Sequence, residues 1–139
     1  MHAPSDHELA SRLREAGVTP TTQRLRVARV LLERDQHLSA EQVMARLKAS
    51  GQRPVSKATV YNTLGLFAQV GLVRQVFADP TRVLYDSNVS DHHHLYDVDS
   101  GELTDVSHES VHVQGLPELT DDMELAGVDV IIKVRSRRR

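Results

Sequence analysis

The sequence carries a run of three histidines behind an acidic residue, Asp91-His92-His93-His94. Side chains alternate between the two faces of a β-strand, so His92 and His94 would share one face and His93 would point to the other. Asp105, on the next expected strand, could reach the same face as His92 and His94. Imidazoles and carboxylates together form a mixed nitrogen and oxygen set that suits Fe(II), Mn(II) or Zn(II). The run therefore predicts a divalent-metal or haem site, although an exposed polar loop would fit it as well.

The chain carries its charges unevenly. Residues 1–84 hold 12 Lys or Arg against 7 Asp or Glu, whereas residues 85–132 hold 12 acidic residues and no Lys or Arg. A basic half that could meet phosphates thus adjoins an acidic half that could attract cations. Two solvated surfaces of opposite sign would produce the same counts, so both interpretations stand on charge alone.

Length and composition fit one domain or two small ones that share an interface. The 139 residues include no cysteine, which excludes disulfides, cysteine-ligated zinc and thiol redox chemistry. No apolar run approaches the roughly 18 residues that span a bilayer, and residues 1–6 lack the apolar core of a signal peptide. We therefore expect a cytoplasmic protein, and any metal in it must use His, Asp or Glu.

The first half predicts four helices followed by a hairpin. Capping residues and apolar faces place helices between Ser5 and Gly17, from Thr19-Pro20 to Arg34-Asp35, between Ser39 and Gly51, and between Ser56 and Gly71. Two strands, Leu72–Phe77 and Arg82–Tyr85, flank an Asp79-Pro80 turn. The third and fourth helices have the short connection of a helix-turn-helix, and a hairpin after them is typical of a winged helix.

The fourth helix would be the recognition helix of that motif and would enter the major groove. Its outward residues combine a cation for phosphates, hydrogen-bonding groups and an aromatic ring that can touch a thymine methyl. These residues are Lys57, Thr59, Tyr61 and Asn62, with Ser56 at the helix start and Arg24 expected near phosphates. A helical pair with an ordinary polar surface is the alternative interpretation of the same pattern.

The second half predicts short strands and one helix. Strands are expected at His93–Val98, Leu103–Val106 and Val128–Val134, and a short helix at Pro117–Leu125. These elements are too few to enclose a core of their own, which favours pairing across a dimer.

Several segments together resemble the Fur family of metal-dependent transcription regulators. They are Ser56-Lys57-Ala58-Thr59-Val60-Tyr61-Asn62-Thr63-Leu64, Thr22-Gln23-Arg24-Leu25, Tyr85-Asp86 and Asp91-His92-His93-His94. The similarity covers nearly the whole chain, and the His triplet and Val128–Ile132 look most like the haem-sensing iron-response regulators, Irr. The resemblance implies an α+β fold, with a winged-helix DNA-binding domain at residues 1–84 and a small α/β dimerisation domain at residues 85–139. It also implies a homodimer that binds double-stranded DNA at palindromic AT-rich operators.

The resemblance also assigns ligands. The regulatory metal of the family, at the hinge between the domains, falls on five plausible ligands: His37, Asp86, His92, His94 and Asp105. A second site in the dimerisation domain would use Asp91, His93 and His112, but the position of its last ligand holds Lys133. The cysteine zinc site of the family and the cysteine-containing haem motif of some iron-response regulators are absent, which leaves His92, His93 and His94 as the haem candidates.

The predicted function is a transcription repressor of iron or haem genes, controlled by a divalent metal and by haem. One ion that ties the domains together would select one separation of the recognition helices. Haem that takes His92 or His94 as an axial ligand would disfavour that state. A peroxide-sensing or Mn/Fe-sensing repressor is the alternative. A metalloenzyme is disfavoured because the sequence indicates no separate nucleophile, general base or substrate pocket, so we predict no enzyme.

Overall fold

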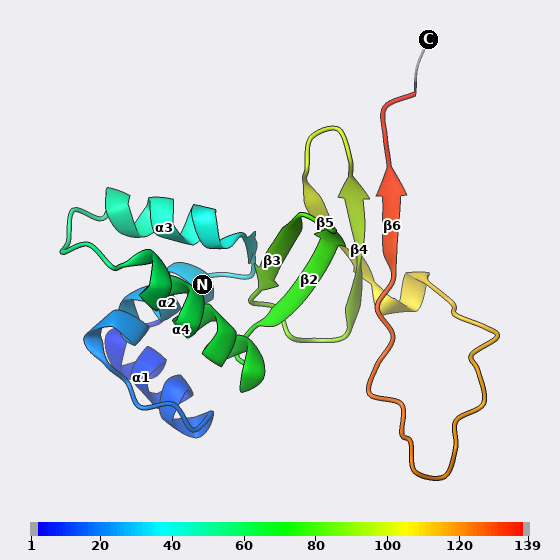
Figure 1. Ribbon diagram of the computed structural model, residues 1–139, viewed down its shortest axis with the longest axis horizontal. Coiled ribbons are helices and arrows are strands. Elements are labelled where there is room, and N and C mark those ends of the chain that lie inside the picture. Colours follow the sequence, from blue (N-terminus) through cyan, green and yellow to red (C-terminus); the bar gives the residue numbers. More distant parts are fainter. Residues whose placement is uncertain (1–2, 138–139) are drawn as a thin grey trace. The chain divides into compact units, whose positions relative to one another are not determined.

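The computed structural model of the protein describes residues 3–137, and therefore not the last two residues of the predicted second domain. The described residues divide into two compact units (Figure 1), with the boundary between Val89 and Ser90. Residues 3–89 are the first unit and residues 90–137 are the second unit. The boundary falls after Val89 rather than after Leu84 because Tyr85 and Asp86 still pair with other strands of the first unit. No helix within the described range is long and apolar enough to cross a membrane.

Four capped helices form most of the first unit. They are α1 (Asp6–Glu15), α2 (Thr22–Leu32), α3 (Ala40–Ala49) and α4 (Lys57–Gln69). Ser39 and Gln42 form the reciprocal capping box that the sequence predicts, and Ser56 caps α4 by accepting a hydrogen bond from a backbone N–H of its first turn. Helix α2 is shorter than predicted, because Thr21 caps it and it ends at Leu32.

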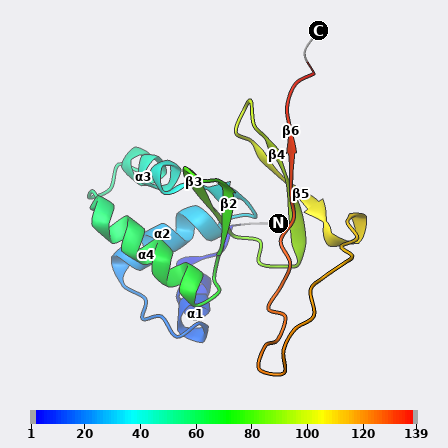
Figure 2. The ribbon, with the colours of Figure 1, turned by 45° about the vertical axis from the view of Figure 1, so that its right-hand side comes forward.

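A three-stranded antiparallel sheet completes the first unit. Strands β1 (His37–Leu38), β2 (Arg74–Asp79) and β3 (Arg82–Asp86) lie in the order β1-β3-β2. The β2–β3 hairpin is the predicted wing, and Figure 2 shows it beside the helices. Strand β1 is absent from the prediction because two residues are too few to reveal the alternation of a strand. Helix-turn-helix and hairpin together form a winged helix.

The helices of the first unit enclose one hydrophobic core. Its fully buried side chains include Leu9, Leu13, Val27, Leu31, Val43, Val60, Leu64 and Phe67. Val60, Leu64 and Phe67 recur at helical spacing on α4, so one face of this helix packs inward. The same packing leaves Lys57 and Tyr61 exposed on the outside. Burial therefore fixes the orientation of the predicted recognition helix.

The second unit is a small sheet with a long loop. Strands β4 (His92–Asp97), β5 (Leu103–Ser107) and β6 (Ile131–Val134) lie in the order β5-β4-β6, and a short 3-10 helix, η1 (His108–Ser110), follows β5. Strand β5 is antiparallel to β4, whereas β6 is parallel to it. Strand β6 begins at Ile131, later than the predicted start at Val128.

The prediction of a helix at Pro117–Leu125 is wrong. The described residues between η1 and β6 form a loop with no helix (Figure 1). Leu119, Met123 and Leu125 are exposed in it, so nothing covers the apolar face that would stabilise such a helix. A helix of this length is unstable in water without a packed face.

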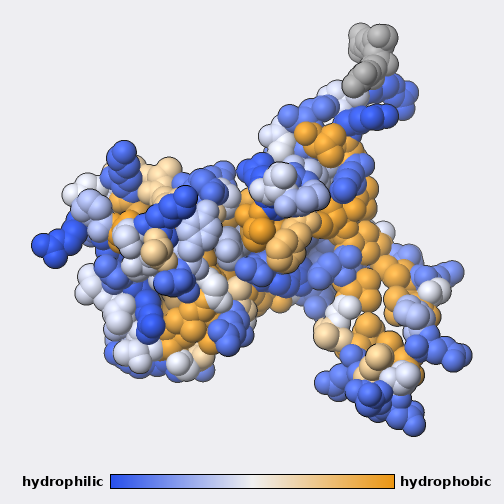
Figure 3. Space-filling view, in the orientation of Figure 1, coloured by the Kyte–Doolittle hydropathy of each residue, from blue (hydrophilic) through white to orange (hydrophobic). Residues whose placement is uncertain are grey.

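Apolar side chains remain exposed over much of the second unit. They are Val98, Val113, Leu116, Leu119, Met123, Leu125, Ile132 and Val134, and Figure 3 shows apolar side chains at the surface along β6 and the loop before it. Among the described residues of this unit, the buried apolar side chains are Tyr96 and Leu103. Such a small core supports the expectation that the second unit is stabilised by a partner.

Candidate metal centre and DNA-binding surface

His37 and Asp86 face each other in the sheet of the first unit. They are paired in the register of β1 and β3, and Nε2 of His37 lies 3.3 Å from Oδ2 of Asp86. Asp86 is fully buried, and its Oδ1 accepts a 2.9 Å hydrogen bond from the backbone N–H of Asn88. A buried carboxylate is costly without compensating charge, so this position favours a cation.

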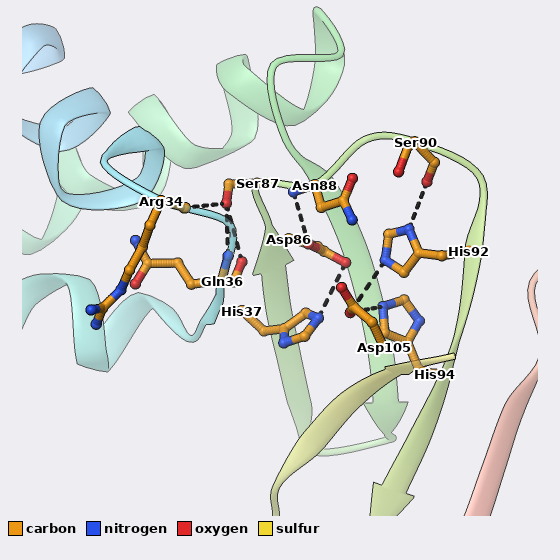
Figure 4. Close-up of polar contacts among 10 residues, drawn as sticks. All are labelled: Arg34, Gln36, His37, Asp86, Ser87, Asn88, Ser90, His92, His94 and Asp105. Atoms are coloured by element: carbon orange, nitrogen blue, oxygen red, sulfur yellow. Dashed lines mark hydrogen bonds and ion pairs between the residues drawn. The ribbon is translucent and has the colours of Figure 1, made fainter. Parts of the chain in front are cut away.

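The chain before β1 holds this pair in register. Gln36 donates through Nε2 to two carbonyl groups at the end of α2, at 2.7 and 3.1 Å, which satisfies groups that the end of a helix leaves free. The Ser87 hydroxyl accepts from the Gln36 backbone N–H at 3.0 Å and lies 2.9 Å from the Arg34 carbonyl, to which it donates (Figure 4). These bonds tie β1 to β3 and explain how His37 comes to lie opposite Asp86.

Three further predicted ligands gather on the sheet of the second unit. His94 and Asp105 are paired in the register of β4 and β5. The Nε2 atoms of His92 and His94 lie 3.5 and 3.7 Å from Oδ1 of Asp105 (Figure 4). The two imidazole rings pack edge to face with centroids 4.6 Å apart. Both histidines are buried, whereas Asp105 is partly open to solvent.

The donor atoms of these two sets suit a divalent ion. Nδ1 of His92 lies 2.6 Å from the carbonyl oxygen of Ser90, which can only accept, so Nδ1 carries the ring proton. Nε2 of His92 then offers a lone pair, as in metal sites where the other ring nitrogen is held by a carbonyl. Ligand atoms about 2.1 Å from one ion lie about 3 to 3.5 Å apart. The separations within each set are close to this range.

His93 points to the other face of β4, as strand alternation predicts. Its Nδ1 accepts a 3.2 Å hydrogen bond from the backbone N–H of Val130. Asp91 and His112, the other predicted ligands of the second metal site, are both exposed. His93 could bind a metal or haem through Nδ1 only after releasing Val130, and the second site stays a prediction.

The predicted DNA contacts lie on α4 and at the start of α2. Ser56, Lys57, Tyr61 and Asn62 are exposed, and Arg24 and Thr59 are partly exposed. Arg24, Thr59 and Asn62 line one shallow hollow of about 290 Å³ where the two helices meet. The six residues are thus all at least partly exposed, and their contact with DNA stays a prediction.

One residue beside this face is absent from the prediction. Glu41, on α3, accepts a 2.7 Å hydrogen bond from the Tyr61 hydroxyl on α4. This hydrogen bond raises the pKa of Tyr61 and lowers the pKa of Glu41. The contact joins two helices, so no local pattern in the sequence could have indicated it.

A winged helix is followed by a small sheet, and each unit has a cluster of imidazole and carboxylate side chains. This is the arrangement of a metal-responsive DNA-binding regulator. Residues 15–132 match the ferric uptake regulator family. The peroxide-responsive repressor PerR of Staphylococcus epidermidis is 31% identical over 103 residues, which cover 72% of this chain and 68% of that protein.

Solved structures give the same result. The ferric uptake regulator of Pseudomonas aeruginosa, determined with manganese, has a TM-score of 0.70 and 27% identity over 92% of this chain and 97% of that chain. The ferric uptake regulator of Vibrio cholerae has a TM-score of 0.69 and 23% identity over 91% and 98% of the two chains. The chain belongs to the ferric uptake regulator family of metal-dependent transcription regulators.

Family membership confirms the predicted α+β fold and a regulator rather than an enzyme. The Staphylococcus epidermidis relative is a peroxide-responsive repressor and not an iron-response regulator, so the finer resemblance to Irr stays a prediction.

Proposed function

We propose that this protein is a repressor whose DNA binding requires one divalent ion, held by His37, Asp86, His92, His94 and Asp105. The observation that carries the proposal is the division of these ligands: two lie on the sheet of the first unit and three on the sheet of the second. Neither set is complete for a six-coordinate ion. One ion that uses both sets would hold the two units in a single arrangement.

The chain between the two sets is short enough for this role. Only five residues separate Asp86 from His92. An extended chain covers at most about 3.5 Å per residue, so the Cα atoms of Asp86 and His92 are never more than roughly 21 Å apart. A tether this short gives each set a high effective concentration near the other, in the millimolar range for flexible linkers. Binding of an ion to one set therefore favours its capture by the other.

The charges of the ligands fit a divalent cation. Asp86 and Asp105 bring two negative charges, which neutralise the ion, and the three imidazoles bind as neutral donors. This nitrogen and oxygen set suits Mn(II), Fe(II) or Zn(II). The structure of the Pseudomonas aeruginosa relative with manganese makes Mn(II) a suitable ion for experiments, and Mn(II) avoids the oxidation of Fe(II).

The DNA target in this proposal is a palindromic AT-rich duplex bound by a homodimer. The exposed face of α4 would enter the major groove, with Lys57 and Arg24 near phosphates. The exposed apolar loop residues of the second unit, Leu116, Leu119, Met123 and Leu125, would pack against a second copy. A dimer places two recognition helices at one fixed spacing, which suits a two-fold symmetric operator.

Fluorescence anisotropy tests the proposal with a duplex selected from random DNA by the Mn(II)-loaded protein. We expect protein stripped with EDTA to bind this duplex at least about tenfold more weakly, and Mn(II) to restore binding. Asp86→Asn and Asp105→Asn should lose the response, whereas Glu102→Gln, an exposed residue beside β5, should keep it. Equal affinity with and without Mn(II) would show that the metal has no such role.

Haem is a second ligand that we propose for the His92–His94 run, in a regulator of iron or haem genes. The Nε2 atoms of His92 and His94 face the same carboxylate, so an axial bond from either to haem iron would remove it from the divalent site. Haem should therefore release the Mn(II)-loaded protein from its duplex. A gel-shift titration in which one equivalent of haem binds and the affinity for DNA stays unchanged would contradict this role.

The peroxide-responsive relative supports a different input to the same site. If the protein senses peroxide, Fe(II) in the site should direct oxidation to one of its own histidine ligands and release the DNA. Mass spectrometry after peroxide treatment should then find one added oxygen on His37, His92 or His94 with Fe(II) and none with Mn(II). Release of the DNA with all histidines unmodified would contradict peroxide sensing by oxidation of a ligand.

A further inference from the structure

Glu41 and Tyr61 form an exposed hydrogen-bonded pair at the edge of the recognition helix. The Tyr61 hydroxyl, in the second turn of α4, donates at 2.7 Å to Oε1 of Glu41, in the first turn of α3. The ammonium group of Lys57, one turn earlier on α4, lies 5.9 Å from the centre of the Tyr61 ring. Two contacts thus hold the Tyr61 side chain: the Glu41 carboxylate at its hydroxyl group and the Lys57 ammonium group over its ring face.

The direction of this hydrogen bond decides what the hydroxyl can offer to DNA. A phenol has one proton to donate, and here the proton goes to a carboxylate, which can only accept. The oxygen of Tyr61 therefore presents only lone pairs to the groove. In the major groove such an acceptor matches the amino groups of adenine and cytosine, and it cannot bond to a phosphate or to the O4 of thymine.

The charge of Glu41 has a second effect at the same place. In the proposed function this surface approaches phosphates, which the Glu41 carboxylate repels, so a duplex that offers Tyr61 no compensating base donor is disfavoured. Glu41, Tyr61 and Arg82 line one cleft of about 190 Å³ between α4 and the wing, together with Tyr85. Arg82 lines this cleft and Lys57 lies over the Tyr61 ring, so the carboxylate also balances local positive charge.

We propose that Glu41 is a specificity-determining residue of the DNA-binding surface, which holds the Tyr61 ring in place and restricts its hydroxyl oxygen to accepting hydrogen bonds from bases. This inference rests on the proposed function, in which α4 reads DNA. A purely structural role for Glu41 is the competing explanation, because an acidic residue in the first turn stabilises α3 through the helix dipole. The two explanations differ in what they predict for DNA discrimination.

The test compares affinities for two probes, the duplex selected by the Mn(II)-loaded protein and a scrambled duplex of equal length. Glu41→Ala should bind the selected duplex about five- to tenfold more weakly, the value of one hydrogen bond. The same variant should bind the scrambled duplex more tightly, because a repulsive charge is gone. Glu41→Gln keeps an acceptor for Tyr61 without the charge, so it should retain most of the affinity for the selected duplex.

A double-mutant cycle ties the effect to the hydroxyl. Tyr61→Phe keeps the ring and loses the oxygen, so it should lower discrimination by itself. Glu41→Ala added to Tyr61→Phe should then cause no further loss on the selected duplex. Equal losses from Glu41→Ala in the presence and absence of the hydroxyl would overturn the inference.

Two controls separate the possible failures. Glu8→Ala removes a first-turn carboxylate from α1 and should leave discrimination unchanged. In a spectroscopic titration of the tyrosines, loss of Glu41 should lower the pKa of Tyr61, with Tyr85, Lys57 and Arg82 as its other ionisable neighbours. If Lys57→Ala binds both probes like the wild type, the proposed DNA surface itself is wrong. If Lys57→Ala weakens binding but Glu41→Ala leaves the ratio of the affinities for the selected and the scrambled duplex unchanged, only the proposed role of Glu41 is wrong.

Discussion

Asp105→Ala, in the second unit, should remove most of the stabilisation that a bound metal gives to the helices of the first unit. Helices α1 to α4 all belong to the first unit, so the circular dichroism signal of α-helix reports on that unit alone. Asp105 belongs to β5 of the second unit. An ion that uses ligands from both units couples the stability of one unit to that of the other. Loss of a ligand in the second unit must therefore lower the metal-induced stability of the first unit.

The expected size follows from linkage. A metal at about one hundred times its Kd stabilises the folded state by about 2.7 kcal/mol. If loss of one ligand weakens binding about a hundredfold, about 0.4 kcal/mol of this stabilisation remains. The difference of about 2.3 kcal/mol corresponds to about 9 to 18 °C in the unfolding midpoint of a domain with the size of the first unit.

His37→Ala provides the matching change in the first unit. Each single variant should lose about 2.3 kcal/mol of the metal-induced stabilisation, and the double variant only about 2.7 kcal/mol, because one ion cannot be lost twice. Two independent ions would give additive losses instead. His37→Ala also leaves the buried Asp86 without its imidazole partner, so only the difference between samples with and without Mn(II) is compared.

Thermal unfolding followed at the helical band, with EDTA or with excess Mn(II), measures these quantities. Glu102→Ala removes a carboxylate from the second unit outside the proposed ligand set and should keep the full metal response. A metal response of the helices that keeps its full wild-type size in Asp105→Ala would refute the idea that one ion links the units.

Other consequences of the structure can be checked separately. Ser56→Ala removes the cap of α4 and should lower the free energy of unfolding in urea by about 1 kcal/mol. Phe67→Ala leaves a cavity at a fully buried position and should lower the free energy of unfolding by about 3 to 5 kcal/mol. Lys57→Ala should weaken binding to all duplexes and reduce the slope of log K against log salt by about 1, whereas Lys48→Ala on α3 should not. Met123→Glu should shift the protein from dimer to monomer in analytical ultracentrifugation.

Much of the fold was predictable because the signals are local. The caps Ser5, Ser39 and Ser56 bond to backbone groups three residues away, and that spacing is visible in the sequence. Alternation along a strand likewise separates His93 from its two neighbours, and in the structure His93 bonds to Val130 whereas His92 and His94 lie beside Asp105. The failed helix at Pro117–Leu125 has a suitable local pattern but no surface to pack against in the single chain.

The sequence by itself determined the types of ligand in this protein. Without cysteine, a metal site must be built from imidazoles and carboxylates, and the His run places two imidazoles on one face of a strand. Only the tertiary structure decided which distant groups meet within each unit, such as Asp105 beside His92 and His94. His37 meets Asp86 because Ser87 bonds across to the segment before β1, and Glu41 meets Tyr61 because α3 packs beside α4. Such contacts depend on long-range packing and hydrogen bonds, which leave no periodic pattern in a sequence.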